Sequence, residues 1–515
     1  MQVINDLENH FSTFLNKPII SLGIIISIGI ILRVYFTNWD IPPFSPDAFV
    51  ILIEGISYSN GDFSYFSNRF LWPMFISFFF IFFNFDNNLE YFNLMRIITI
   101  LISVASIPII YHISKHYVDK KYAIIAGAFF AVEPNIIENS LFLITEPLFI
   151  LCGLLSVYFL IQKNNKLIVL SFLFAGLSFD TRLNGIVLIL LILVFCILKI
   201  RRRKISIKLF VIGCIILLFV VTPYIYPRES GNSPISVYYS DTLKIILNNE
   251  ELSATYSSNS ENNSSIIQTA IIKDLIYLVR ISVPFLIFFV PIGIISSIKK
   301  IDINKQILFS TIIISLIVAI PQNLISAEYR NLLFIVPIFC ILSVIGIQRI
   351  FNGRKYQNIY IIFTLMVVIF VSFSFLTYQL DKDISLMEEK EMFGKFVISN
   401  FSGRILGGPY NELSHNIPNA VLGKDLMEGN IHNDKIAIIV TYDPIDSKTK
   451  LEKIMTDLQI DFIIVDNIQN NRFPVFQDIF ENEEKYPELE KIFDSDEHGY
   501  KKYKVKIFKK NLISP

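Results

Sequence analysis

Long apolar runs separated by short polar segments fill the first 380 residues of the chain. Several runs hold about 20 apolar residues, enough for an α-helix to cross roughly 30 Å of hydrocarbon. The pattern predicts about eleven membrane-spanning helices, at residues 18–37, 93–114, 122–134, 139–161, 166–181, 183–199, 208–226, 275–298, 306–325, 330–350 and 357–379. A further apolar run at 69–85 is short and contains Pro73.

The distribution of Lys and Arg predicts how the helices are oriented. Cytoplasmic loops carry an excess of these residues. The basic loops are at 115–121, 199–208, 297–305 and 348–355. All four lie on one side only if the run at 69–85 does not cross. We therefore expect a multi-pass protein of the cell membrane with a cytoplasmic N-terminus, a re-entrant or interfacial segment at 69–85, and an extracytoplasmic C-terminal part.

The polar tail predicts a second domain. "KIAIIV" at 435–440 and "DFIIVD" at 461–466 are strand candidates, and "SKTKLEKIMTDLQ" between them has helical spacing. Strand, helix and strand in this order are typical of a βαβ unit. We therefore expect a membrane domain at 1–380 and a soluble α/β domain at 381–515, without the glycine-rich motif of a nucleotide site.

Composition excludes several function classes. Lys and Arg together number 45, as do Asp and Glu, so the net charge is zero and no nucleic-acid partner is expected. The four cysteines all lie in apolar runs, which argues against a disulfide framework or a zinc site. No HExxH, GxSxG, CxxC or Walker motif is present. Ionisable residues in or beside the spans are therefore the candidates for chemistry.

Asp47 is the first candidate, in the segment "IPPFSPDAFV" at 41–50. A carboxylate at the outer membrane surface can act as general base and deprotonate an acceptor hydroxyl or amine. Alternatively, Asp47 caps a helix that begins "AFVILIEGISY", and the two roles are compatible. Glu54, seven residues later, would share a face of that helix.

Glu146 is the second candidate, early in the span within "NSLFLITEPLFILCGLL". A carboxylate at that depth needs a partner or a metal ion. The alternative is a simple kink at Pro147. We expect Glu133 and Glu138, in the adjoining outer turn, to be solvated.

Arg69, Arg182 and Arg330 lie at the outer ends of different apolar runs. The positive-inside bias makes arginines on this side unexpected. Because a guanidinium can bind two oxygens of a phosphate at once, their convergence near Asp47 would form a site for a membrane-borne phosphate. The alternatives are interfacial anchoring and a local pair of Asp180 with Arg182.

The order of these segments resembles a known superfamily. A first span is followed by an outer loop with an acid, a Pro-containing amphipathic run, the long segment from "YFNLMRIITI" to "LLSVYFL", then "LSFLFAGLSFDTRLNGIVLILLIL" and "EYRNLLFIVPIF". Over roughly residues 15–350 the chain resembles the GT-C glycosyltransferases, in the branch of the protein mannosyltransferases and lipid-A aminoarabinose transferases.

The resemblance implies an integral-membrane enzyme that uses a polyprenyl- or dolichyl-phosphate sugar donor. It would transfer the sugar, with inversion, to a protein, glycan or lipid acceptor on the outer face.

The resemblance also implies roles for residues. Asp47 matches the first acid of the family's acidic pair, but Ala48 stands where the second acid is common, so Glu54 and Glu146 are its substitutes. Arg69, Arg182 and Arg330 match the family's basic residues and would bind the donor phosphate. A donor with one phosphate needs no metal for charge stabilisation, so neither a cofactor nor a metal ion is predicted.

Three alternatives compete with this interpretation. An oligosaccharyltransferase would carry a WWD-type signature, whereas Trp39 and Trp72 stand alone. A lipid or sugar transporter or flippase would show inverted repeats, and none is visible. A non-catalytic membrane scaffold would have no use for Asp47.

Overall fold

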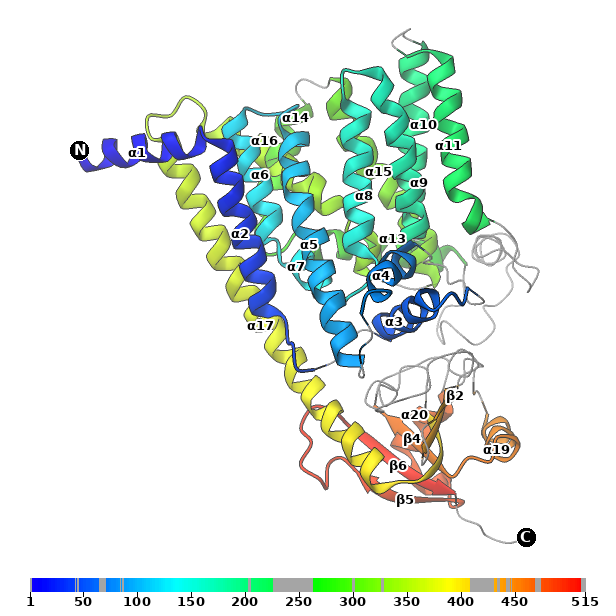
Figure 1. Cartoon of the computed structure of the whole chain (residues 1–515). Coiled ribbons are helices and arrows are strands. Elements are labelled where there is room, and N and C mark those ends of the chain that lie inside the picture. The colour runs from blue at the N-terminus through cyan, green and yellow to red at the C-terminus, as the bar shows by residue number, and fades with distance from the viewer. Residues whose placement is uncertain are drawn as a thin grey trace.

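The computed structural model describes residues 2–41, 43, 46–63, 71–83, 85, 88–201, 205–225, 263–298, 302–325, 328–407, 430–432, 436–440, 445, 447–467 and 474–510. These residues form a large bundle of helices with a small mixed sheet beyond one end (Figure 1). The helix α17 (Gln357–Asn400) runs along the bundle and continues into the sheet domain.

The bundle is built from helices in chain order. They are α1 (Gln2–Leu15), α2 (Pro18–Phe36), α3 (Pro46–Ser59), α4 (Leu71–Phe80), α5 (Asn88–Ser114), α6 (Lys120–Val132), α7 (Pro134–Leu141), α8 (Glu146–Ile161), η1 (Asn165–Leu167), α9 (Ile168–Thr181), η2 (Leu183–Gly185), α10 (Ile186–Arg201), α11 (Ile207–Ile225), α13 (Asn263–Arg280), α14 (Leu286–Ile298), α15 (Ile303–Ile325), η3 (Tyr329–Leu332), α16 (Ile335–Phe351) and α17.

Among the described residues, five helices are long and apolar enough to cross a membrane. They are Pro18–Phe36, Asn88–Ser114, Leu183–Arg201, Asn304–Asn323 and Gln357–Leu380. Other apolar helices are shorter, including α8 and α16. The chain is thus a multi-pass helical membrane protein.

Three of the predicted continuous spans are broken in the structure. The span predicted at 139–161 is divided into α7 and α8 by residues 142–145. The span predicted at 275–298 is divided by a turn at 281–285, and the one predicted at 330–350 begins with η3 before α16. Backbone outside a helix is tolerated at membrane depth where it is buried in protein or lines a cavity. All three breaks lie at the end of the bundle that faces the sheet (Figure 1).

The helix α4 is only 10 residues long, about 15 Å at 1.5 Å per residue. It cannot cross roughly 30 Å of hydrocarbon, in line with the interfacial segment predicted at 69–85. It packs beside α3 at the end of the bundle nearest the sheet domain (Figure 1).

The central helix α16 is fixed by close backbone packing. A Cβ at Gly293 of α14 would lie 1.9 Å from the carbonyl oxygen of Leu342 in α16. Small residues allow this approach between membrane helices. Every residue from Ile335 to Ile347 is buried, so α16 gives a rigid base to η3 at its N-terminal end.

The sheet has the order β2-β3-β1-β4-β6-β5. Its strands are β1 (Gly403–Gly407), β2 (Asn430–His432), β3 (Ile436–Val440), β4 (Phe462–Asp466), β5 (Leu489–Asp494) and β6 (Val505–Lys510). β1 pairs in parallel with β3 and β4, and the other pairs are antiparallel. The helices α19 (Lys448–Asp457) and α20 (Pro474–Glu481) and the short η5 (Glu483–Lys485) complete the domain. The strand, helix and strand expected from 435 to 466 correspond to β3, α19 and β4.

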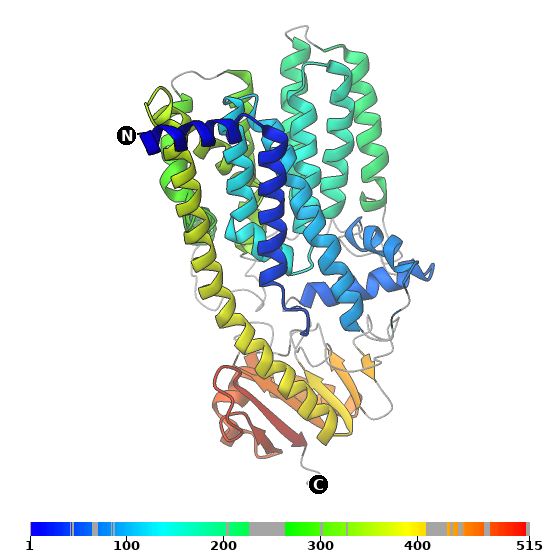
Figure 2. The same ribbon diagram turned by 60° about the vertical axis from the view of Figure 1, so that its left-hand side comes forward.

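Successive side chains along a strand of the sheet pack into two hydrophobic layers, one on each face. Ile463 and Val465 of β4 pack in the cluster with α19 and α20. Ile464 points to the opposite face, toward Phe393 and Val397 of α17. The end of α17 is therefore one layer of the sheet domain, and Figure 2 shows this helix joining the two parts of the chain. The domain boundary expected at 380 falls inside this continuous helix.

Glu389 anchors the turn before β6 to α17. Its carboxylate accepts hydrogen bonds from the backbone N–H groups of Lys501, Lys502 and Tyr503, at 3.1, 2.8 and 2.7 Å. Burial alone would raise the pKa of Glu389, but these three donors and the Lys502 charge outweigh it and lower the pKa below its usual 4.5. Hydrogen bonds to the charged form favour that form.

We predict that Glu389→Gln loosens this junction at neutral pH. The anchor requires the carboxylate, so its contribution is present above the unfolded-state pKa and is lost as the pH falls through the lower folded-state pKa. Amide hydrogen exchange at 501–503 should be faster in the variant than in the wild type at pH 7, and the difference should vanish near pH 3. The exposed neighbour Glu388, changed to Gln, is the control. Equal exchange at pH 7 would refute the anchor.

Candidate active site

Arg330, in η3, lies between two carboxylates that are 99 residues apart in sequence. Its Nη1 is 3.7 Å from Asp47 Oδ2 and 3.6 Å from Glu146 Oε1. Both separations are ion-pair distances that exceed the usual range of a hydrogen bond. The Asp47 side chain is 31% exposed, whereas that of Glu146 is 1% exposed. One accessible acid and one buried acid thus face the same guanidinium.

Asp47 lies inside the first turn of α3, which begins at Pro46. The N-cap role considered for it is therefore not what the structure shows. α3 packs against α4, and the buried Trp72 of α4 donates through Nε1 to the carbonyl of Leu143 at 3.2 Å. Leu143 belongs to the turn just before Glu146. This hydrogen bond ties the unit formed by α3 and α4 to the turn at the N-terminal end of α8, and so brings Asp47 toward Glu146.

Two side chains of α5 hold the segment that leads to Asp47. Asn93 donates through Nδ2 to the carbonyl of Trp39 at 3.1 Å. Arg96 donates to the carbonyl of Ile41 and to Asn93 Oδ1. These side chains therefore hold the backbone at Trp39 and Ile41, eight and six residues before the acid.

Glu146 is the first residue of α8, and Pro147 follows in the first helical turn. Proline fits this position because the first N–H groups of a helix have no partner within the helix. It marks the helix start and not a kink. Thr145 donates to Glu146 Oε2 at 3.2 Å, and Arg182 forms an ion pair with Oε1. The buried carboxylate thus has the cationic partner that its depth requires.

Arg182 lies in extended backbone between α9 and η2, with φ of −157°. Its Nη1 contacts Glu146, and its Nη2 donates to Asn331 Oδ1 at 3.2 Å. The alternative partner Asp180 is not used: its Oδ1 is buried and has no hydrogen-bond partner within the described part of the chain. Arg182 therefore joins α8 to η3.

Packing keeps α8 and the start of α16 in register. The Phe149 and Phe334 rings lie 5.6 Å apart between centroids. A Cβ at Gly153, one turn later in α8, would come within 2.3 Å of the Phe334 ring. Only glycine fits there unless Phe334 moves. Because Phe334 comes two residues after η3 ends, this contact helps to fix the position of Arg330 relative to Glu146.

The predicted convergence is seen for Asp47, Arg182 and Arg330, with Glu146 at its centre. Arg69 lies outside the described residues, so its role stays a prediction. Glu54 is buried about two turns further along α3 than Asp47. Of the two proposed substitutes for a second acid, Glu146 is the one that shares a cation with Asp47.

The expectation that Glu133 and Glu138 are solvated is wrong, because their exposed fractions are 0% and 4%. Glu133 accepts the N–H of Ile136 at 2.8 Å and so caps α7. Glu138 accepts from Tyr329 Oη at 3.2 Å and from Gln379 Nε2 at 2.6 Å. Tyr329 precedes Arg330, and Gln379 lies on α17, so Glu138 connects the site to the helix that carries the sheet domain.

Sequence reasoning also missed Arg33, which is fully buried. Its Nε donates to Ser103 Oγ at 3.1 Å, and its Nη1 donates to the carbonyl of Ala131 at 3.0 Å. These contacts join α2, α5 and α6. A charged residue inside an apolar run was the available signal. The available signal for a structural role of Glu133 was the proline that follows it, because Pro147 follows Glu146 in the same way.

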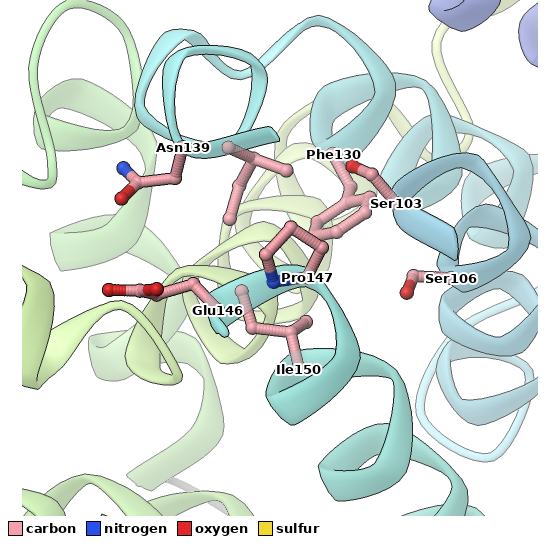
Figure 3. A pocket seen from close by; sticks show the side chains of 8 residues that line it. Ser103, Ser106, Phe130, Asn139, Glu146, Pro147 and Ile150 are labelled. Atoms are coloured by element: carbon pink, nitrogen blue, oxygen red, sulfur yellow. The ribbon is translucent and has the colours of Figure 1, made fainter. Parts of the chain in front are cut away.

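A small pocket lies behind Glu146 (Figure 3). Asn139 and Glu146 lie on one side of it, and Ser103 and Ser106 lie on the opposite side, with Pro147 between them. Ser103 also contacts Arg33. Ser103 therefore links one wall of this pocket to the buried Arg33.

The site combines carboxylates with arginines. Among the described residues, no three His, Cys, Asp or Glu side chains are close enough to hold an ion together. The two acids that approach each other share the guanidinium of Arg330, which occupies the position between them.

Comparison with known proteins relates part of the sequence to one family. Residues 70–226 match the family model described as dolichyl-phosphate-mannose-protein mannosyltransferase. This range includes α4 to α11 and the residues Glu146 and Arg182. No curated protein matches the chain.

Several solved structures share the fold. The oligosaccharyltransferase of Archaeoglobus fulgidus in complex with Zn and sulfate has a TM-score of 0.57 at 13% identity, over 87% of this chain and 68% of that chain. The same protein, AglB, with an inhibitory peptide and a dolichol-phosphate has a TM-score of 0.54 at 12% identity, over 87% and 69%. ArnT from Cupriavidus metallidurans bound to undecaprenyl phosphate has a TM-score of 0.51 at 10% identity, over 96% and 99%. The predicted GT-C resemblance is thus confirmed for the fold.

Proposed function

We propose that the chain is a membrane glycosyltransferase that moves a sugar from a polyprenyl- or dolichyl-phosphate donor to a protein, glycan or lipid acceptor. The observation that carries this proposal is the position of Arg330 between Asp47 and Glu146. The match of residues 70–226 to a family of dolichyl-phosphate-mannose-dependent transferases supports it. So does the fold shared with two proteins that bind dolichol-phosphate and undecaprenyl phosphate.

Asp47 serves as the general base. It is the more exposed of the two acids, so an acceptor hydroxyl can approach it. Asp47 takes the hydroxyl proton as the acceptor oxygen forms a bond to the anomeric carbon. The bond from that carbon to the phosphate oxygen breaks, and its electron pair leaves with the lipid phosphate. A single displacement of this kind inverts the anomeric carbon.

Arg330 stabilises the leaving phosphate, on which negative charge develops. Its Nη1 approaches both carboxylates without close hydrogen bonds, so a phosphate oxygen can take that donor. Fixed donors aimed at developing charge are the largest contribution in many active sites. Arg182 neutralises Glu146, and Arg330 Nη2 pairs with Glu328 Oε2 at 2.7 Å, so Nη1 is the donor that we propose for the substrate. We propose Arg69 as a further phosphate ligand and Glu146 in the place of the second acid.

We predict that Asp47→Asn abolishes transfer, because the amide cannot accept the acceptor's proton. Loss of a general base lowers the rate by roughly 10²- to 10⁴-fold. The measurement is transfer of radiolabelled sugar from a polyprenyl-phosphate donor by the purified protein. Asp40→Asn, an exposed acid in the same outer segment, is the matched control. Undiminished turnover in Asp47→Asn, with a wild-type melting temperature, would refute the assignment.

We further propose that the reaction needs no divalent metal ion. A donor with one phosphate places less charge on the leaving group than a diphosphate donor does. Two arginines are then sufficient to stabilise the charge on the leaving phosphate.

Transfer should therefore continue at an unchanged rate in excess EDTA. The assay compares the EDTA-treated protein with the same preparation after Mn²⁺ or Mg²⁺ is added back. Loss of turnover in EDTA and its recovery with either ion would contradict the metal-free mechanism.

The site and the sheet domain are proposed to lie on the extracytoplasmic side, with the N-terminus in the cytoplasm. In this arrangement residues 1–380 are the catalytic membrane domain and 381–515 the extracytoplasmic domain. The excess of Lys and Arg in the four basic segments at 115–121, 199–208, 297–305 and 348–355 supports this orientation.

A membrane-impermeant thiol reagent should label a cysteine placed at Asn60 in intact cells, but not one placed at Arg354. Both positions are exposed. Cys152, Cys196 and Cys340 are buried, and Cys214 lies within the apolar helix α11, so the natural thiols do not interfere. The reverse labelling pattern would invert the proposed topology.

The alternatives of a lipid or sugar transporter and a scaffold are less well supported. Both alternatives lack support from the family match of residues 70–226.

A further inference from the structure

A chain of side chains leads from Arg182 to a buried carboxylate that has no part in the chemistry proposed above. Arg182 Nη2 donates to Asn331 Oδ1 at 3.2 Å. Asn331 Nδ2 donates to Asn323 Oδ1 at 3.0 Å, and Asn323 Nδ2 donates to Asp274 Oδ1. The path runs from η2 through η3 and α15 to α13. It begins at a cation and ends at an acid.

All hydrogen bonds of this chain point in one direction. A carboxylate only accepts hydrogen bonds, so Asp274 requires the amide nitrogen of Asn323. The amide oxygen of Asn323 must then face the other way. There it meets Asn331 Nδ2 and, at 3.2 Å, the backbone N–H of Glu328, which can only donate. Both ends of the Asn323 amide are thus determined by their partners, and aligned hydrogen bonds reinforce one another.

The oxygen of Asn323 holds two residues on either side of Arg330. Glu328 is two positions before Arg330, and Asn331 directly follows it. The Asn331 backbone has a further anchor, because Asn184 Nδ2 donates to its carbonyl at 3.0 Å. Asp274 and Asn323 are both buried, with exposed fractions of 3%. One buried amide oxygen therefore sets the backbone that presents the guanidinium.

From this geometry we propose that Asp274 and Asn323 form a positioning clamp for Arg330 and Arg182. The two residues do not touch the substrate. They fix the short helix η3, so that Arg330 stays between Asp47 and Glu146 and Asn331 turns its oxygen to Arg182. The inference rests on the proposed function for the step that Arg330 assists, whereas the clamp itself is a property of the fold.

Exchanging the acid and the amide between positions 274 and 323 tests the clamp. Asn323→Asp alone places two carboxylates in contact, and like charges at that distance repel. The double variant Asp274→Asn with Asn323→Asp restores one amide and one acid. Its Asn at 274 can donate to the new carboxylate, which still accepts from Glu328 and Asn331. The double variant has the composition and net charge of the wild type, so it is the matched control. Asp274→Asn completes the cycle.

Two measurements on the purified full chain are compared. Amide hydrogen exchange at residues 328–334 reports the clamp without any substrate. Turnover at saturating polyprenyl-phosphate sugar reports its effect on the reaction. In Asn323→Asp, exchange should speed up and turnover should fall by about tenfold or more, the usual effect of a broken buried hydrogen bond to a charged group. The double variant should recover both, as expected for directly coupled residues.

The outcomes separate the clamp from the proposed function. A double variant as impaired as Asn323→Asp in both measurements would overturn the clamp, as would a single variant with wild-type exchange and turnover. The expected exchange pattern in a chain that transfers no sugar even as wild type would support the clamp and overturn the proposed function. Recovery of exchange without recovery of turnover would overturn the claim that the clamp positions Arg330 for the reaction.

Discussion

Ion pairs between one guanidinium and three carboxylates organise the end of the helix bundle nearest the sheet domain: Arg330 pairs with Asp47, Glu146 and, at 2.7 Å, Glu328. Arg330 brings together α3, which carries Asp47, and α8, which begins at Glu146. A charge that is removed from water is stable only when it is paired with good geometry. A buried carboxylate such as Glu146 therefore tolerates little displacement of its cationic partners. Arg182 supplies the second cation. The surrounding structure then serves to hold these groups: Trp72 fixes α4 to the turn before Glu146, and Phe334 packs over Gly153.

The site is built where helices are interrupted. Glu146 begins α8 after a break, Arg182 lies between α9 and η2, and Arg330 lies in η3 before α16. In lipid, a backbone group without a partner is costly, so such breaks need protein around them. Here side chains bind the backbone groups that the breaks leave without a partner. Asn323 accepts from the N–H of Glu328, Asn184 donates to the carbonyl of Asn331, and Glu133 caps α7. Glu138 extends this network to Gln379 on α17, which continues into the sheet domain.

Much of the helical organisation followed from apolar runs, because length and composition alone decide whether a helix can cross a bilayer. The breaks could not be predicted from these runs. The apolar pattern of 139–161 is the same with or without a turn at 142–145. The βα elements of the tail were visible because β3 and β4 are short apolar runs around an amphipathic helix. Asp47, Glu146, Arg182 and Arg330 were identifiable as charges beside spans. Asp274 directly precedes the span predicted at 275–298, but its pairing with Asn323 was not predictable, since only the fold brings residues 49 positions apart into one hydrogen bond. Asn331 gave no signal, because polar residues near loops are common.

The central claim is that Arg330 binds the phosphate of a lipid-linked donor. Its most direct test is the affinity of the purified chain for undecaprenyl phosphate in detergent, measured for Arg330→Lys. Lysine keeps the positive charge, but it lacks the planar guanidinium that can bind two phosphate oxygens at once. Arg349→Lys, an exposed arginine near the opposite end of α16, is the control. The account predicts that Arg330→Lys weakens binding by about tenfold or more, while Arg349→Lys binds as the wild type does. Equal affinity in the wild type and Arg330→Lys would contradict it.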